Sequence, residues 1–217
     1  MDGPRLLIVE DHALLAQTLS VALGAEGFKI NVPAQLDAAS VRASARELKP
    51  TVVLLDLDLG TGESGLSLIG PLRETGAEVV VMTGTADRAQ LGECLEAGAS
   101  GVFRKSQPFE QLVETIRVAA GHGAVTPATA RQELLRVLRD RRTADSARLE
   151  PLERLSPRET EVLKLLTDGR SAEKIAGELV VSMATVRTQI RSILIKLGVN
   201  SQLEAVALAR RSDWFSG

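Results

Sequence analysis

Residues 51–65 read TVVLLDLDLGTGESG, an apolar run that ends in an aspartate and passes into a glycine-rich segment. A strand without polar interruptions is typical of a parallel sheet that helices cover on both faces. Comparable runs lie at 5–9 (RLLIV), 29–32, 78–82 (EVVVM) and 101–104 (GVFR). The segments between and after them predict helices at 12–26, 37–48, 65–75, 88–97 and 109–120. Five strand–helix units in series predict an α/β domain with a doubly wound, five-stranded parallel sheet.

Composition restricts the classes of protein that remain. Of the 217 residues only 2% are aromatic, which disfavours the stacking of nucleic-acid bases on aromatic side chains. The single cysteine, Cys94, excludes an internal disulfide and a cysteine-cluster metal site, and it reads as a packing residue in a helix. No apolar run approaches the roughly 20 residues of a membrane span, and the N-terminus lacks a signal-peptide layout. We therefore expect a cytoplasmic protein that has no membrane partner.

The alternating pattern stops after the fifth unit. Residues 121–126 (GHGAVT) interrupt it, 127–142 predict one helix, and 143–150 are polar and charged, as in a linker. After Pro151 the chain reads as all-helical. These changes predict a first domain over 1–121, a helical linker over 122–153 and a second, all-α domain over 154–217.

Acidic and polar residues stand where the predicted strands end. Glu10 and Asp11 follow the first strand, Asp56 ends the third, Thr83 follows the fourth and Lys105 follows the fifth. These ends share one rim of a parallel sheet, so we expect the side chains to converge. An all-oxygen set of carboxylates suits Mg²⁺ rather than zinc. A carboxylate beside that ion can attack a phosphoryl group, whose oxygens the lysine and the threonine could neutralise or hydrogen-bond.

The two histidines give no comparable signal. His12 follows the acidic pair and stands where a helix begins, and His122 lies in a glycine-flanked turn. Neither has a partner at metal-ligand spacing in the sequence. We therefore predict that His122 is a loop residue rather than a catalyst.

Four stretches resemble the receiver domain of two-component response regulators and occur in its order: LLIVEDH (6–12), VVLLDLDLGTGESG (52–65), VVVMTG (79–84) and GASGVFRK (98–105). The resemblance covers about residues 4–121 and implies a flavodoxin-like fold. It implies that Asp56 is the phosphoacceptor and that Glu10 and Asp11 help to hold Mg²⁺. It also implies that Asp58 offers its backbone carbonyl to the metal, that Thr83 senses the phosphoryl group and that Lys105 pairs with it.

Two positions depart from the receiver pattern. Receivers commonly carry Tyr or Phe three residues before the lysine, as an aromatic that swings inward on activation, and Val102 stands there instead. The aromatic part of the switch is therefore missing or works differently. The frequent proline of the loop after the phosphoacceptor is replaced by Gly60, with Thr61 and Gly62 beside it, so we expect a more flexible loop.

An enzyme is the alternative reading of the same residues. Asp56-Leu57-Asp58, followed by Thr83 and Lys105, also resembles phosphatases of the haloacid dehalogenase type. There the first aspartate is a nucleophile and the second an acid–base catalyst. That family places its remaining metal-binding carboxylates after the lysine, whereas the acidic pair precedes everything here. The order favours a receiver, and hence a protein that is not an enzyme.

The C-terminal segment predicts four helices, at 157–168, 172–179, 184–197 and 203–210, each with a serine before its start. The third has an apolar stripe at Val186, Ile190, Ile193, Leu194 and Leu197. Arg187, Thr188, Gln189 and Arg191 remain for its other faces, and no acid occurs from 182 to 197. A short helix, a tight turn and a polar-basic helix are the layout of a helix-turn-helix, whose second helix enters the major groove.

Nearly the whole of residues 155–209 resembles the LuxR/NarL-type effector domain. The resemblance implies that 184–197 is the recognition helix and that Arg187, Thr188 and Arg191 occupy its DNA-facing positions. Gln189 stands where the family usually has His, and Glu159 matches an acidic position for which we expect a structural role. A plain four-helix bundle that uses its arginines for solubility is the alternative.

The two resemblances together identify the chain as a member of the NarL/LuxR (FixJ) family of response regulators. We expect a transcription regulator that a sensor histidine kinase phosphorylates on Asp56 with Mg²⁺, and whose homodimer binds double-stranded DNA, with RNA polymerase as a further candidate partner. A constitutive DNA-binding regulator, whose receiver-like domain only dimerises, is the alternative that Val102 and the altered loop favour.

Overall fold

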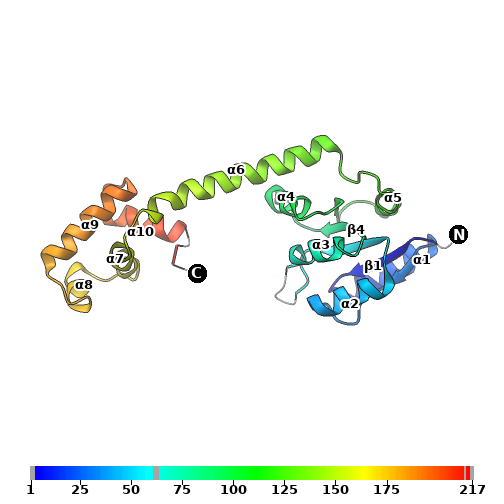
Figure 1. Ribbon diagram of the computed structural model, residues 1–217, viewed down its shortest axis with the longest axis horizontal. Coiled ribbons are helices and arrows are strands. Elements are labelled where there is room, and N and C mark those ends of the chain that lie inside the picture. Colours follow the sequence, from blue (N-terminus) through cyan, green and yellow to red (C-terminus); the bar gives the residue numbers. More distant parts are fainter. Residues whose placement is uncertain (1–2, 61–63, 213, 216–217) are drawn as a thin grey trace. The chain divides into compact units, whose positions relative to one another are not determined.

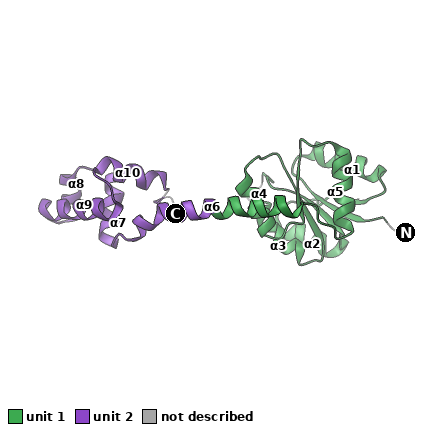
Figure 2. Ribbon diagram, turned by 90° about the horizontal axis from the view of Figure 1, so that it is seen from above, with its two compact units in different colours: residues 1–139 green, residues 140–217 purple. Residues whose placement is uncertain are grey.

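The computed structural model describes residues 3–60, 64–212 and 214–215 (Figure 1). The chain divides into two compact units, Met1–Arg139 and Asp140–Gly217, which Figure 2 distinguishes by colour. Each unit has its own hydrophobic cores, and the two are described in turn.

Five parallel strands form one sheet in the first unit, in the order β2-β1-β3-β4-β5. They are β1 (Arg5–Val9), β2 (Lys29–Asn31), β3 (Val52–Asp56), β4 (Glu78–Thr83) and β5 (Gly101–Arg104). Strand β3 is buried at every residue, as its apolar sequence predicts. The strand order reverses between β1 and β3, and open α/β sheets bind ligands at such a point. The predicted five-stranded parallel sheet is confirmed.

Helices cover both faces of the sheet: α1 (Ala13–Ala25), α2 (Ala38–Leu48), α3 (Leu66–Arg73), α4 (Arg88–Glu96) and α5 (Phe109–Ala120). Successive strand residues face opposite sides, so alternate positions feed two cores. Ile8 and Leu54 pack with α1 and α5. Val53 packs with α2, α3 and α4 in the second core of this unit. Cys94 of α4 belongs to this second core and has no exposed surface. Burial raises the pKa of the Cys94 thiol to about 11, so the residue packs as predicted and is no nucleophile.

Helix α6 (Ala128–Glu153) is the main difference from the sequence prediction. We expected a helix that ends at 142 and a polar linker at 143–150, but the helix continues through that segment. Alanine, arginine, leucine and glutamate are good helix formers, and Arg141 pairs with Asp145 one turn away. Polarity alone therefore does not end a helix. Residues 128–139 belong to the first unit and the remainder to the second.

Four further helices form the second unit: α7 (Pro157–Thr167), α8 (Ala172–Glu178), α9 (Met183–Leu197) and α10 (Gln202–Arg211). Each begins after a serine whose hydroxyl accepts a backbone N–H, and these caps are Ser156, Ser171, Ser182 and Ser201. Helix α9 ends at Gly198, which has a φ of 67°. The core of the unit joins all four helices with Leu152 of α6. The predicted all-α helix-turn-helix domain is confirmed.

No single helix in the described part of the chain is both long and apolar enough to span a bilayer. Helices α9 and α10, which meet at a bend of 58°, reach that length and apolarity only in combination. Their buried apolar side chains belong to the core of the second unit.

Candidate functional site

The C-terminal ends of β1, β3 and β5 bring one cation between two buried carboxylates. Lys105 Nζ lies 2.6 Å from Asp56 Oδ2 and 2.8 Å from Glu10 Oε2. Asp56 is 1% exposed and Glu10 is 3% exposed. The ammonium group therefore offsets the repulsion between two carboxylates that water reaches poorly. Burial lowers the pKa of Lys105, but its hydrogen bonds to Asp56 and Glu10 outweigh that effect, and its pKa is raised overall.

Asp11 joins Glu10 and Asp56 in a cluster of three carboxylates, here called the acidic group. One of its oxygens has no hydrogen bond. Its Oδ1 is buried and accepts none, although His12 Nδ1 lies 2.8 Å away. That contact is an ion pair by distance when the imidazole is protonated, without the angles of a hydrogen bond. Gly60 approaches from the loop after β3 with a φ of +60°, and a Cβ on it would lie 2.7 Å from Asp11 Oδ2. The carboxylate oxygen could step aside for a Cβ, but the positive φ at this point of the loop favours glycine.

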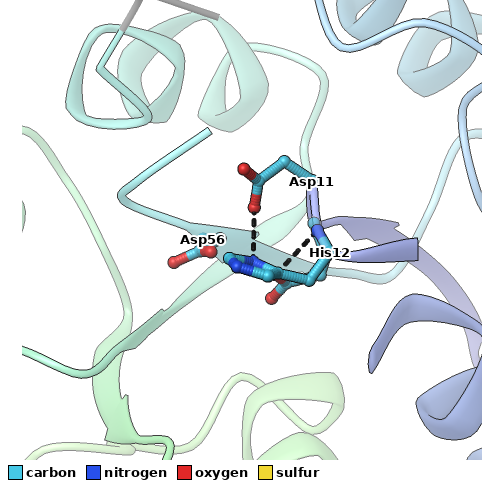
Figure 3. A group of neighbouring side chains, drawn as sticks. Asp11, His12 and Asp56 are labelled. Atoms are coloured by element: carbon cyan, nitrogen blue, oxygen red, sulfur yellow. Dashed lines mark hydrogen bonds and ion pairs between the residues drawn. The ribbon is translucent and has the colours of Figure 1, made fainter. Parts of the chain in front are cut away.

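His12 lies in the same group, which the sequence did not indicate. Its Nδ1 is 3.0 Å from Glu10 Oε1, and Figure 3 shows its imidazole beside the carboxylates of Asp11 and Asp56. Potential ligand atoms of these four residues all lie within 4.8 Å of one another. The hydrogen bond to Glu10 and the charges of Asp11 and Glu10 raise the pKa of His12. Spacing along the sequence gives His12 no partner, whereas the fold brings its imidazole to the carboxylates at the ends of the strands.

Thr83 and Asp58 stand at the edge of the acidic group. Thr83 is the last residue of β4 and 1% exposed, and its Oγ1 accepts a hydrogen bond of 3.0 Å from the backbone N–H of Thr85. Among the described residues, no hydrogen bond joins Thr83 to Asp56. The side chain of Asp58 is exposed, and its backbone N–H donates to Asp56 Oδ1 at 3.4 Å. Thr61 and Gly62, which we expected to loosen this loop, lie outside the described residues.

His122 is a loop residue. It follows α5 with a φ of 56°, and its Nδ1 lies 3.0 Å from Glu78 Oε1. Glu78 begins β4, whereas Thr83 ends it, so this pair lies at the opposite end of the strand from the acidic group.

Helix α9 presents a basic, exposed surface in the second unit. Arg187, Thr188 and Arg191 are exposed, whereas Val186 and Ile190 face the core. Gln189 differs from its neighbours, because it is half-buried and its Oε1 is buried without a hydrogen-bond partner. The structure therefore brings three of the four predicted DNA-binding residues onto the surface and only part of the fourth.

Glu159 of α7 holds α9 in place from the other side. It is 6% exposed and accepts hydrogen bonds from Ser192 Oγ and Lys196 Nζ, both at 2.6 Å, and from the Ser156 N–H at 2.7 Å. Burial alone would raise the pKa of Glu159, but these donors lower it to about 2. The contacts agree with the expected structural role.

Comparison with known families identifies the class of protein. The response regulator receiver domain family matches residues 6–117, and the luxR family of bacterial regulatory proteins matches residues 153–209. The chain therefore belongs to the response regulators that carry a LuxR-type DNA-binding domain. It is a transcription regulator of the two-component type and not an enzyme.

Individual relatives extend the match to nearly the full chain. The oxygen regulatory protein NreC of Staphylococcus aureus strain JH9 is 30% identical, over 94% of this chain and 96% of its own. The transcriptional regulatory protein DesR of Bacillus subtilis strain 168 is 28% identical, over 97% of this chain and 98% of its own.

Solved structures share the fold. Full-length FixJ from B. japonicum matches with a TM-score of 0.50 and 22% identity, over 99% of this chain and 100% of its own. RcsB from Salmonella enterica serovar Typhimurium, bound to promoter rprA in the presence of the phosphomimetic BeF3⁻, matches with a TM-score of 0.50 and 22% identity, over 95% of this chain and 98% of its own.

Proposed function

We propose that Asp56 accepts a phosphoryl group from a sensor histidine kinase and that the modification controls dimerisation and DNA binding. The observation that carries the proposal is the contact of Lys105 with Asp56 Oδ2 and Glu10 Oε2, at 2.6 and 2.8 Å. A buried carboxylate beside a lysine at a topological switch point combines a nucleophile with a cation for the incoming phosphate.

Mg²⁺ suits the acidic group. Asp11 Oδ1 is buried and accepts no hydrogen bond, and a hard cation would replace the ion pair that His12 Nδ1 makes with this oxygen at 2.8 Å. Asp11 and Asp56 would hold the ion, with Glu10 beside them and the backbone carbonyl of Asp58 as a further ligand. When bound, Mg²⁺ would neutralise charge on the carboxylates and on the phosphoryl oxygens.

Transfer of the phosphoryl group from the kinase histidine to Asp56 needs no further reactant. A carboxylate oxygen of Asp56 forms a bond to phosphorus, and the bond from phosphorus to the kinase histidine breaks with its electron pair left on nitrogen. Lys105 lies within reach of the new phosphoryl oxygens. The Thr83 hydroxyl, which now accepts from Thr85, would turn to donate to them.

DNA binding is assigned to the exposed surface of α9. Arg187 and Arg191 lie one turn apart, suited to phosphates or guanine edges, with Thr188 between them. A dimer would present two such helices to two half-sites, and RNA polymerase would be a further partner at a promoter. Gln189 would contribute less to the contact, because its side-chain oxygen is buried.

The test compares phosphorylation and DNA binding in one set of variants. The full chain is incubated with Mg²⁺ and a small phosphodonor, and intact mass and affinity for a DNA site selected from a random pool are measured. We expect one phosphoryl group and tighter DNA binding in the wild type and in Glu47→Ala, which removes an exposed carboxylate of α2 and is the matched control. Asp56→Ala should show neither, and its normal phosphorylation would refute the assignment.

A constitutive regulator is the second candidate, and Val102 favours it. Val102 is a half-buried residue of β5, next to β4, and it offers no ring to report on the phosphorylation site. Beryllofluoride with Mg²⁺ separates the two candidates: unchanged dimerisation and DNA affinity would support the constitutive regulator.

A further inference from the structure

We propose that residues 128–139 of α6, the docked segment, are held on α4 by contacts that a change at Thr83 releases. The docked segment would then take the place of the aromatic side chain that Val102 lacks. The release by a phosphoryl group rests on the proposed function of Asp56, whereas the docking itself does not.

Gly92 marks the point where α6 crosses α4. A Cβ built on Gly92 would lie 2.7 Å from the Leu134 carbonyl oxygen and 3.0 Å from Leu138 Cβ. The first distance is to backbone, which cannot step aside as the end of a side chain can. Leu138 is 1% exposed, so the two helices are closely packed at this crossing. Only glycine in α4 allows α6 to approach this closely.

Polar contacts fix the docked segment at both ends of α4. Arg131 donates to the carbonyl oxygens of Leu95, at 2.9 Å, and Ala99, at 3.3 Å. Carbonyl groups at a helix C-terminus lack partners within the helix, so a guanidinium group is a favourable donor to them. At the other end Arg88, the first residue of α4, lies 3.3 Å from Glu133. The docked segment therefore contacts the start, the middle and the end of α4.

A chain of hydrogen bonds runs from Thr83 to the start of α4. Thr83 Oγ1 accepts from the N–H of Thr85 at 3.0 Å, and Thr85 Oγ1 accepts from the N–H of Asp87 at 3.1 Å. Asp87 is the N-cap of α4 and accepts from the N–H groups of Ala89 and Gln90. When the Thr83 side chain rotates toward a phosphoryl group, its Oγ1 moves away from the Thr85 N–H, and the cap of α4 loses its support.

The space beside Val102 lets α4 move. A cavity of about 590 Å³ lies between α4, β5 and α6, and its lining includes Leu91, Val102, Ala130 and Leu134. A tyrosine or phenylalanine at 102 would reach further into this region than valine does. With valine, α4 can shift over β5 without displacing a ring, and the shift alters the contacts of the docked segment. Because α6 continues to Glu153, this change reaches the helix that enters the second unit.

Hydrogen–deuterium exchange of the full chain tests the docking from both helices. Gly92→Ala places a methyl group against α6, and Arg131→Ala removes the donors to Leu95 of α4 and to Ala99 after its end. Each should raise exchange at 128–139 by about tenfold or more, as expected when a packed contact is lost. Gly24→Ala is the matched control, because it also replaces a helical glycine but meets no atom within 4 Å. Unchanged protection of 128–139 in both variants would overturn the docking.

Beryllofluoride with Mg²⁺ tests the release. In the wild type we expect faster exchange at 83–92 and at 128–139 together. A response confined to 83–92 would overturn the release. No response at any peptide, those with Asp56 and Lys105 included, would contradict the proposed function instead, and the Gly92→Ala and Arg131→Ala comparison would still decide the docking.

Discussion

Two buried carboxylates in this chain, Glu159 and Asp56, differ in the number of donors that hold them, and the difference fits a structural role for Glu159 and the proposed reactive role for Asp56. Glu159 accepts from Ser192, Lys196 and a backbone N–H, all at 2.7 Å or less. Asp56 has one short donor, Lys105 at 2.6 Å, and one long one at 3.4 Å. Glu159 has little acceptor capacity left for chemistry, whereas Asp56 retains lone pairs for a metal or for phosphorus.

Glu159 gives the second unit a defined response to acid. Its pKa is about 2 in the folded protein and ordinarily 4.5, so its contribution is complete above about pH 4.5 and is lost as the pH falls toward 2. We expect Glu159→Gln to lower the free energy of unfolding at pH 7 by about 1–3 kcal/mol. The loss is limited because Lys196 is 35% exposed, so solvent screens its ion pair with Glu159.

Urea unfolding followed by the fluorescence of Trp214, the single tryptophan, measures this effect. The gap between wild type and Glu159→Gln should close between pH 4.5 and pH 2. Glu161→Gln, an exposed neighbour on α7 that pairs with Arg158, is the control and should change little. Equal pH profiles for both variants would contradict the prediction.

The sequence predicts side-chain convergence better than side-chain orientation. Glu10, Asp56 and Lys105 meet because the ends of parallel strands share one rim, whatever their rotamers. The approach of His12 depends on its rotamer at the start of α1, about which its position after Asp11 says nothing. The same limit applies to Gln189, since helical periodicity marks the apolar stripe of α9 but not how far a residue beside it is buried.

At the scale of elements, starts were easier to predict than ends. Serine caps precede all four helices of the second unit, and their hydroxyls bond as expected. The sequence does not mark the end of α6, because a polar, charged segment is typical of both a linker and an exposed helix. Its helical state depends on the packing of Leu149 and Leu152 into the second core, which is a tertiary effect.

Helix α9 should bind DNA through its arginines more than through Gln189. We expect Arg191→Ala to cost about 1–3 kcal/mol of binding free energy if the side chain reads a base, with relaxed sequence preference. If it holds a phosphate, affinity should fall uniformly and the salt slope should drop by about 1. Gln189→Ala should change affinity less, because its oxygen is buried.

Fluorescence anisotropy on a selected and a scrambled duplex, over a range of salt concentrations, distinguishes these cases. Lys164→Ala is the control for charge, since Lys164 is exposed and belongs to α7 rather than to α9. A loss in Lys164→Ala as large as in Arg191→Ala would contradict recognition by α9.

At the scale of the whole molecule, the two family matches leave residues 118–152 unassigned, and α6 occupies most of that interval. Its first part packs in the first unit through Leu138, which is 1% exposed. Its last part packs in the second unit through Leu152, which has no exposed surface. A helix with core residues in both units is a part of each domain rather than a spacer between them.

The N-terminal boundary of the DNA-binding domain can therefore be tested directly. The sequence predicts that it begins at 154, and such a fragment retains α7 to α10 but lacks Leu152. We expect fragment 154–217 to be less stable than fragment 145–217 by roughly 2–5 kcal/mol, the usual cost of removing a buried leucine. Leu152→Ala within fragment 145–217 should bring its stability close to that of the shorter fragment.

Urea unfolding measures the stability of all three proteins. Because the fragments share α9, their DNA affinity under native conditions should differ little. Equal stability of the two fragments would mean that the end of α6 adds nothing to the second core and that the limit at 154 stands.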